Sequence, residues 1–99
     1  MLGPVETEIM KDVRLRQARD NFVRLITEEL DNAYAKHGSE PWSRHEFYAI
    51  FLEEVDELWD DIKADKPLDE LLHELVQVAA MCLRYAETGD MAEVVRDLE

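Results

Sequence analysis

The chain has 99 residues, and 24 acidic against 11 basic side chains give it a formal net charge of −13. This excess of negative charge disfavours binding to nucleic acid or to an anionic membrane surface. Hydrophobic residues make up 46% of the sequence, which is too many for a disordered chain, so we expect one folded domain over residues 1–99. A chain this short buries only a small core, and we therefore expect it to form an oligomer.

The sequence carries no pattern of a secretory signal or a membrane span. Its longest apolar run, residues 75–83, is much shorter than the roughly 20 residues that a membrane-spanning helix needs. We therefore expect a cytoplasmic protein. A single cysteine, Cys82, excludes an internal disulfide, and its place in this apolar run predicts a buried structural thiol.

The first predicted helix is long. Pro4 suits a first helical position, and Lys36 and His37 before Gly38 are typical of a helix end. The apolar stripe of this helix is clear after residue 20 and loose before it. Five of the eleven basic residues lie in or just after the looser part: Lys11, Arg14, Arg16, Arg19 and Arg24. They predict a solvated face, a subunit contact onto the acidic second helix, or a contact with ligand phosphate.

A capping box fixes the start of the second predicted helix, because Ser43 is followed three residues later by Glu46. Trp42 precedes this cap and faces Phe47, as in a hydrophobic staple. The apolar stripe then runs to residue 62, and Trp59 lies on its apolar side, where we expect it in the core.

The third predicted helix begins near Pro67, ends at Thr88 and is apolar nearly all round, which predicts a central position in the bundle. Asp90 then has N-cap spacing for a short last helix. No stretch shows the alternation of a strand. The sequence therefore predicts an all-α fold, a small helical bundle of about four helices.

Two pairs of oxygen-bearing side chains interrupt the apolar pattern. Glu54 with Glu57, and Glu74 with Gln77, are each spaced i, i+3, so each pair lies on one face of its helix. Two such helices side by side would form a four-oxygen site, which suits a hard cation such as Mg²⁺. An unpaired carboxylate inside an apolar stripe needs a cation or another partner, because its burial costs several kcal/mol.

Two other interpretations of these acids are open. In the first, they are structural and pair with Arg or Lys side chains of the first helix. In the second, Glu70 and His73 belong to a ferritin-like di-iron site. That design requires two Glu-x-x-His elements from different helices, and the sequence contains one.

The order of the acids resembles a known family. Glu53-Glu54-x-x-Glu57, followed later by Glu74-x-x-Gln77, is similar to the signature of the MazG-like all-α nucleoside triphosphate pyrophosphohydrolases. That signature is Glu-Glu-x-x-Glu and then Glu-x-x-Asp. The resemblance covers roughly residues 20–88, and it implies a helical fold that assembles as a homodimer or homotetramer.

The resemblance implies hydrolysis of a nucleoside or deoxynucleoside triphosphate to the monophosphate and pyrophosphate. It assigns Glu54, Glu57, Glu74 and Gln77 to Mg²⁺, with Mn²⁺ as an alternative ion. It implies a catalytic role for Glu53, either as an acid close to the metal ligands or as a water-orienting base. Gln77 departs from the family aspartate, so the site loses one negative charge and a proton acceptor. We expect weaker metal binding and impaired turnover.

Substrate contacts are predicted from side-chain chemistry within this resemblance. Lys63, Lys66 and Arg84 are candidates for holding the phosphates, and Trp42 and Tyr48 for stacking on the base. The choice of base and sugar is open. The competing interpretation is a non-catalytic helical dimerisation or regulatory module that retains the fold, and Gln77 favours it.

Overall fold

The structure, a computed structural model, describes residues 6–98, and this part of the chain contains four α-helices and no strand. The helices are α1 (Glu8–His37), α2 (Arg44–Lys63), α3 (Leu68–Thr88) and α4 (Ala92–Arg96). The predicted all-α class is confirmed. The predicted start of the first helix at Pro4 lies outside the described residues.

Local hydrogen bonds set the ends of the helices. The Thr7 hydroxyl accepts from the backbone N–H of Met10 and caps α1. Gly38 follows α1 with φ of 82°, a left-handed conformation that favours glycine. At the start of α2 both hydrogen bonds of the predicted capping box between Ser43 and Glu46 are present.

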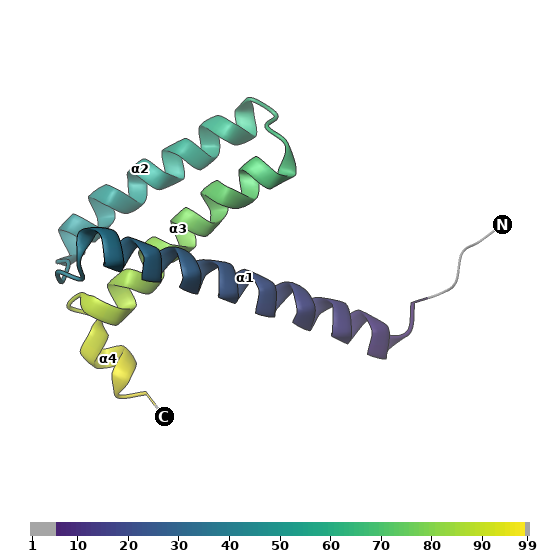
Figure 1. Cartoon of the computed structure of the whole chain (residues 1–99), viewed down its shortest axis with the longest axis horizontal. Helices are drawn as coiled ribbons and strands as arrows, with labels where there is room; N and C mark the ends of the chain where they lie inside the picture. The colour runs from purple at the N-terminus through teal and green to yellow at the C-terminus, as the bar shows by residue number, and fades with distance from the viewer. Residues whose placement is uncertain (1–5, 99) are drawn as a thin grey trace.

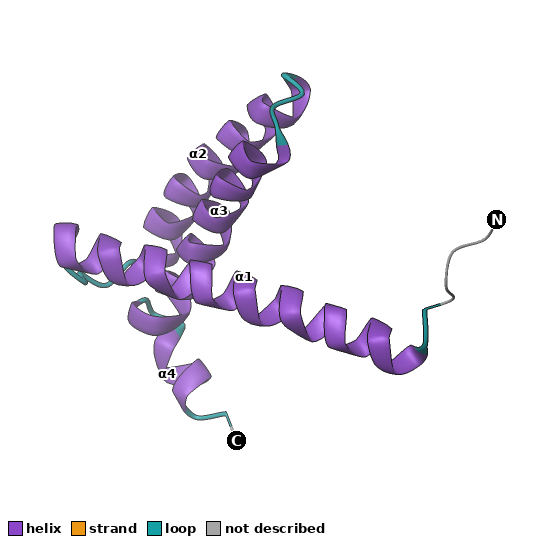
Figure 2. Ribbon diagram, turned by 45° about the vertical axis from the view of Figure 1, so that its right-hand side comes forward, coloured by secondary structure: helices purple, strands orange, loops and turns teal. Residues whose placement is uncertain are grey.

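Helix α3 is the element that contacts each of the others. Helices α2 and α3 form an antiparallel hairpin, and α1 crosses it near the end where the α1–α2 loop and α4 lie (Figure 1). Figure 2 shows the amino-terminal half of α1 projecting away from this crossing. The crossing therefore places the second half of α1 beside the polar positions of α3.

The core at this crossing is small. Its buried apolar residues are Leu30, Val76, Ala80 and Ala92. The radius of gyration is 17.0 Å, whereas a compact chain of this length has about 13 Å. Much of the apolar surface of α1, α2 and α3 is consequently left uncovered in the isolated chain.

Several burial predictions were wrong for this reason. Trp59 is 54% exposed, and Cys82 is also exposed, although both lie in apolar stretches. On α3, Leu72 and Leu75 are exposed, so the nearly all-apolar helix is covered on one side only. Asp90 does not cap α4, since its carboxylate accepts hydrogen bonds from the Tyr85 hydroxyl and the Arg44 guanidinium.

We expect Leu30→Ala to lower the free energy of unfolding by about 2–5 kcal/mol, because Leu30 is 1% exposed and its removal leaves a cavity at the helix crossing. Urea denaturation followed by circular dichroism measures the change. Leu98→Ala is the matched control, since Leu98 is 71% exposed. Equal effects of the two substitutions would contradict the placement of the core.

Candidate metal centre

Three carboxylates converge between α2 and α3. Glu54 and Glu57 come from α2 and Glu74 from α3, and one oxygen of each lies within 4.8 Å of one from each of the other two. The i, i+3 spacing puts the first two on one face of α2, and the packing of α2 against α3 brings the third opposite them. Three of the four side chains that the sequence pattern predicted together are therefore adjacent.

No basic side chain neutralises these three carboxylates by a salt bridge within residues 6–98. Near the α2–α3 turn, Lys63 forms a salt bridge with Asp60, and Lys66 forms one with Glu70. On α1, Arg24 pairs with Glu28. The interpretation in which the acids are held by Arg or Lys of the first helix is therefore wrong for this structure.

Glu74 supplies the most direct sign of a missing partner. Its Oε2 is buried and makes no hydrogen bond. Partial burial, followed by the charges of Glu57 and Asp61, raises the pKa of Glu74. Burial likewise raises the pKa of Glu54, with the charges of Glu57, Glu74 and Glu53 adding to the effect. The cluster thus places three carboxylates together around one buried oxygen that lacks a donor, and carboxylate oxygens are the ligands that a hard divalent cation prefers.

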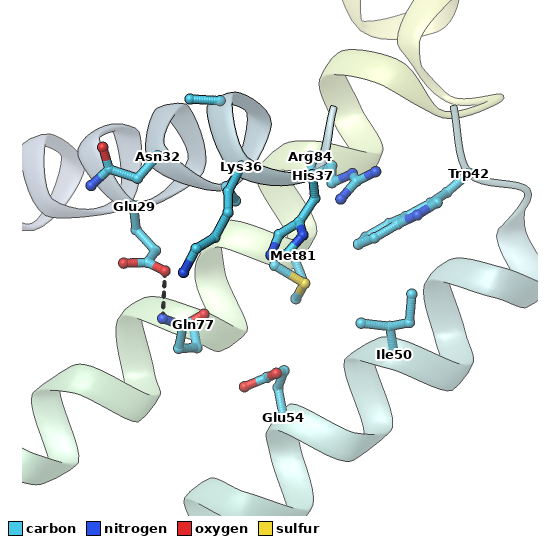
Figure 3. A pocket seen from close by; sticks show the side chains of 12 residues that line it. Glu29, Asn32, Lys36, His37, Trp42, Ile50, Glu54, Gln77, Met81 and Arg84 are labelled. Carbon is cyan, nitrogen blue, oxygen red and sulfur yellow. Dashed lines mark hydrogen bonds between the residues drawn. The ribbon is translucent and has the colours of Figure 1, made fainter. Parts of the chain in front are cut away.

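Gln77 is the predicted ligand that the structure places differently. Its amide nitrogen donates a hydrogen bond of 2.7 Å to a carboxylate oxygen of Glu29 on α1 (Figure 3). The amide therefore joins α1 to α3. Gln77 lines a cavity together with Glu54. Its hydrogen-bond partner, Glu29, was not among the predicted site residues.

The di-iron interpretation finds no support in this arrangement. Glu70 pairs with Lys66, and His73 is exposed. Within the part of the chain that the structure describes, the only group of three or more histidine, cysteine or acidic side chains at metal-binding distances is Glu54, Glu57 and Glu74.

A cavity of about 710 Å³ opens beside the carboxylate cluster, between the end of α1, the α1–α2 loop, α2 and α3. Glu54 and Gln77 line one end of it, the Lys36 side chain reaches toward Gln77, and Trp42 and Arg84 line the other end (Figure 3). The Arg84 guanidinium lies 3.9 Å from the centre of the Trp42 ring. The volume is in the range of small-molecule sites, and the cavity combines an acidic end with a cationic and aromatic one.

The remaining predicted site residues divide between this cavity and other surfaces. Trp42 and Arg84 line the cavity, and the Arg84 side chain also donates to the backbone oxygen of Glu40. Tyr48 is 58% exposed and does not line it. Lys63 and Lys66 do not line it either, although Lys66 borders a separate hollow beside Glu74. Glu53 is exposed next to the cluster.

Sequence analysis missed the contribution of α1 to this cavity. Glu29, Asn32, Lys36 and His37 all line it. Lys36 and His37 had a sufficient local explanation as cations in the last turn of a helix. The signal for their second role is the short loop to Trp42, which keeps the end of α1 close to the start of α2.

Comparisons with protein-family models, with curated proteins and with solved structures gave no match for this chain. Within residues 6–98, none of the helices combines the length and the apolar character required to cross a membrane. The fold and the site together define an all-helical protein with a three-carboxylate cluster beside an open polar cavity.

The cluster predicts a specific pH dependence of stability in the absence of divalent ions. Because folding raises the pKa of Glu54 and Glu74, the folded chain binds more protons than the unfolded chain at intermediate pH. Stability should therefore fall as the pH rises through these raised pKa values. Glu54→Gln should raise the free energy of unfolding at pH 7 by up to about 1 kcal/mol after allowance for solvent screening. This corresponds to an increase in Tm of at most roughly 4–8 °C.

Thermal unfolding at pH 5 and pH 7 in EDTA measures this effect. Asp56→Asn is the control, because Asp56 is an exposed acid of α2 outside the cluster. A lower Tm of Glu54→Gln than of wild type at pH 7 would show that Glu54 has a stabilising partner and is not repelled by its neighbours.

Proposed function

We propose that Glu54, Glu57 and Glu74 bind a divalent cation, Mg²⁺ or Mn²⁺. The unpartnered Oε2 of Glu74 carries this proposal, together with the approach of three carboxylate oxygens to within 4.8 Å. Carboxylate oxygens are the ligands that these hard ions prefer, and Mg²⁺ keeps further positions for water and substrate phosphates. A bound cation would offset the repulsion that raises the pKa of Glu54 and Glu74.

We further propose that the protein is a MazG-like nucleoside triphosphate pyrophosphohydrolase. Two features support this activity: the order of the acids along α2 and α3, and a cavity that extends from Glu54 to the Trp42–Arg84 pair. The triphosphate would lie at the acidic end on the bound cation. The base would lie toward Trp42, whose ring offers a stacking surface.

The side chains would divide the work of hydrolysis. Glu54, Glu57 and Glu74 hold the cation, which supplies charge neutralisation and a more acidic water. Glu53 accepts a proton from the attacking water, whose oxygen bonds to phosphorus as the phosphorus–oxygen bond of the α–β bridge breaks. Lys36, whose side chain reaches toward the Gln77 end of the cavity, would balance the charge of the departing pyrophosphate, whereas Arg84 lies at the base end beside Trp42 (Figure 3). The products are the monophosphate and pyrophosphate.

We expect release of pyrophosphate from one or more members of a panel of nucleoside and deoxynucleoside triphosphates, only when Mg²⁺ or Mn²⁺ is present. Glu74→Gln should lower kcat by about 100-fold or more, because it removes a charge that the transition state needs. Glu70→Gln is the matched control on the same helix, since Glu70 is exposed and paired with Lys66. A coupled pyrophosphate assay measures both.

A non-catalytic dimerisation or regulatory module is the second candidate function, and Gln77 in place of the family aspartate favours it. A neutral amide oxygen is a weaker ligand than a carboxylate. Absence of pyrophosphate release from the whole panel at high protein and Mn²⁺ concentrations would leave this module as the better account.

Self-association is part of the proposed function. Residues 8–21 of α1 are exposed throughout, and apolar side chains such as Leu15, 58% exposed, and Val23 are left without a partner in the isolated chain. An apolar groove of about 360 Å³ lies near the α2–α3 turn. It is lined by Leu58, Ile62, Leu68, Leu71, Leu72 and Leu75. Uncovered apolar surface on both elements favours burial against a second chain.

We propose that the amino-terminal half of α1 from a second copy occupies this groove, in a homodimer or homotetramer. Charge complementarity supports this occupant. Five of the eleven basic residues lie between residues 11 and 24, whereas residues 53–61 of α2 contain six acids and no basic residue. The basic side chains of one copy would thus face the acidic helix of the other.

The substitutions Leu15→Asp and Val23→Asp in one variant should dissociate the oligomer, because they place two charges on the surface that would be buried between copies. Size-exclusion chromatography with light scattering gives the molar mass. Leu98→Asp, just after α4, should leave the mass unchanged. A wild-type chain that is monomeric at millimolar concentration would rule out this assembly.

A further inference from the structure

Glu29 is half-buried in the carboxy-terminal third of α1 and faces α3 across the helix crossing. Its carboxylate accepts the 2.7 Å hydrogen bond from the Gln77 amide (Figure 3). An amide group donates only through its nitrogen and accepts only through its oxygen. Because a carboxylate acceptor lies on one side of Gln77, the amide nitrogen must face that side and Oε1 must face away from Glu29.

The orientation of this amide matters for the carboxylate cluster. Gln77 follows Glu74 by one helical turn on the same face of α3, and it lines the same cavity as Glu54. With its nitrogen held by Glu29, the Gln77 amide leaves Oε1 free to face the cavity that Glu54 also lines. With the amide reversed, α3 would offer N–H groups, which repel a cation and cannot coordinate it.

We propose that Glu29 is a positioning residue for the cation site: it fixes the Gln77 amide so that Oε1 serves as an oxygen donor beside Glu54 and Glu74. This role rests on the proposed cation site, and Glu29 itself does not touch the ion. The carboxylate that the family signature places on α3 is therefore replaced by a neutral oxygen, which a carboxylate on α1 orients. Groups that orient the ligands of a metal ion in this way contribute strongly to its affinity.

The alternative is that the Glu29–Gln77 contact only ties α1 to α3. The two roles differ in what they change. A structural tie affects the stability of the metal-free chain, and any loss of metal affinity follows from that. A positioning role affects the affinity for the ion while the metal-free stability stays the same.

Glu29→Gln separates them, because the new amide at position 29 still forms a hydrogen bond with Gln77 but accepts either orientation of it. We expect the Kd for Mn²⁺, measured by calorimetry with the metal alone, to rise about tenfold. The Tm in EDTA should not fall. Glu28→Gln is the control, since Glu28 is the neighbouring acid of α1 and pairs with Arg24 on the surface.

The double variant Glu29→Gln with Gln77→Glu exchanges the two side chains and should restore metal binding. The amide at position 29 then donates to a carboxylate at position 77, which keeps an oxygen directed at the cluster. We expect the Mn²⁺ affinity to return at least to the wild-type value. Wild-type affinity in Glu29→Gln alone, or loss of affinity that tracks a lower Tm, would overturn the role of Glu29. Absence of Mn²⁺ binding by the wild-type chain would instead overturn the cation site itself, and with it this inference.

Discussion

The mutual repulsion of three carboxylates is the constraint on which the rest of the structure depends. The packing of α2 against α3 holds Glu54, Glu57 and Glu74 together, without a salt bridge to any Lys or Arg of residues 6–98. Burial, together with the neighbouring negative charges, raises the pKa of Glu54 and Glu74, so keeping both ionised opposes folding. This carboxylate cluster, which has no salt bridge to a basic residue within residues 6–98, is the observation on which the proposed cation site rests.

The helices around the cluster each have a definite part in this arrangement. Helices α2 and α3 supply the carboxylates, and α1 closes one side of the cavity through Glu29 and Lys36. The same crossing buries Leu30, the most completely buried large side chain. Leu30 and Glu29, which accepts the hydrogen bond from Gln77, are neighbours in the sequence, so the same turn of α1 packs into the core and borders the cavity.

Local chemistry made the helices predictable. The capping box of Ser43 and Glu46 fixed the start of α2, and Pro67 marked the break before α3. The i, i+3 spacing also predicted which acids share a face, and the convergence of Glu54, Glu57 and Glu74 follows once two helices pack in a hairpin. These features depend on residues close together in the sequence, which is why they could be predicted without the fold.

The parts that could not be predicted depend on how α1 crosses the hairpin. An apolar stripe shows which face of a helix avoids water but not which element covers it, so Trp59 and Cys82 were assigned to a core that the isolated chain does not build around them. The pairing of Gln77 with Glu29 joins residues 48 positions apart. Neither residue carries a local pattern that points to the other.

Paramagnetic broadening by Mn²⁺ in the amide NMR spectrum locates a bound ion most directly. Addition of Mn²⁺ at a small fraction of the protein concentration should first broaden the amides around Glu54, Glu57 and Glu74, and excess Mg²⁺ should restore them. Broadening centred instead on the exposed acids Asp56 and Asp60, or no site-specific broadening at all, would contradict a cation site between α2 and α3.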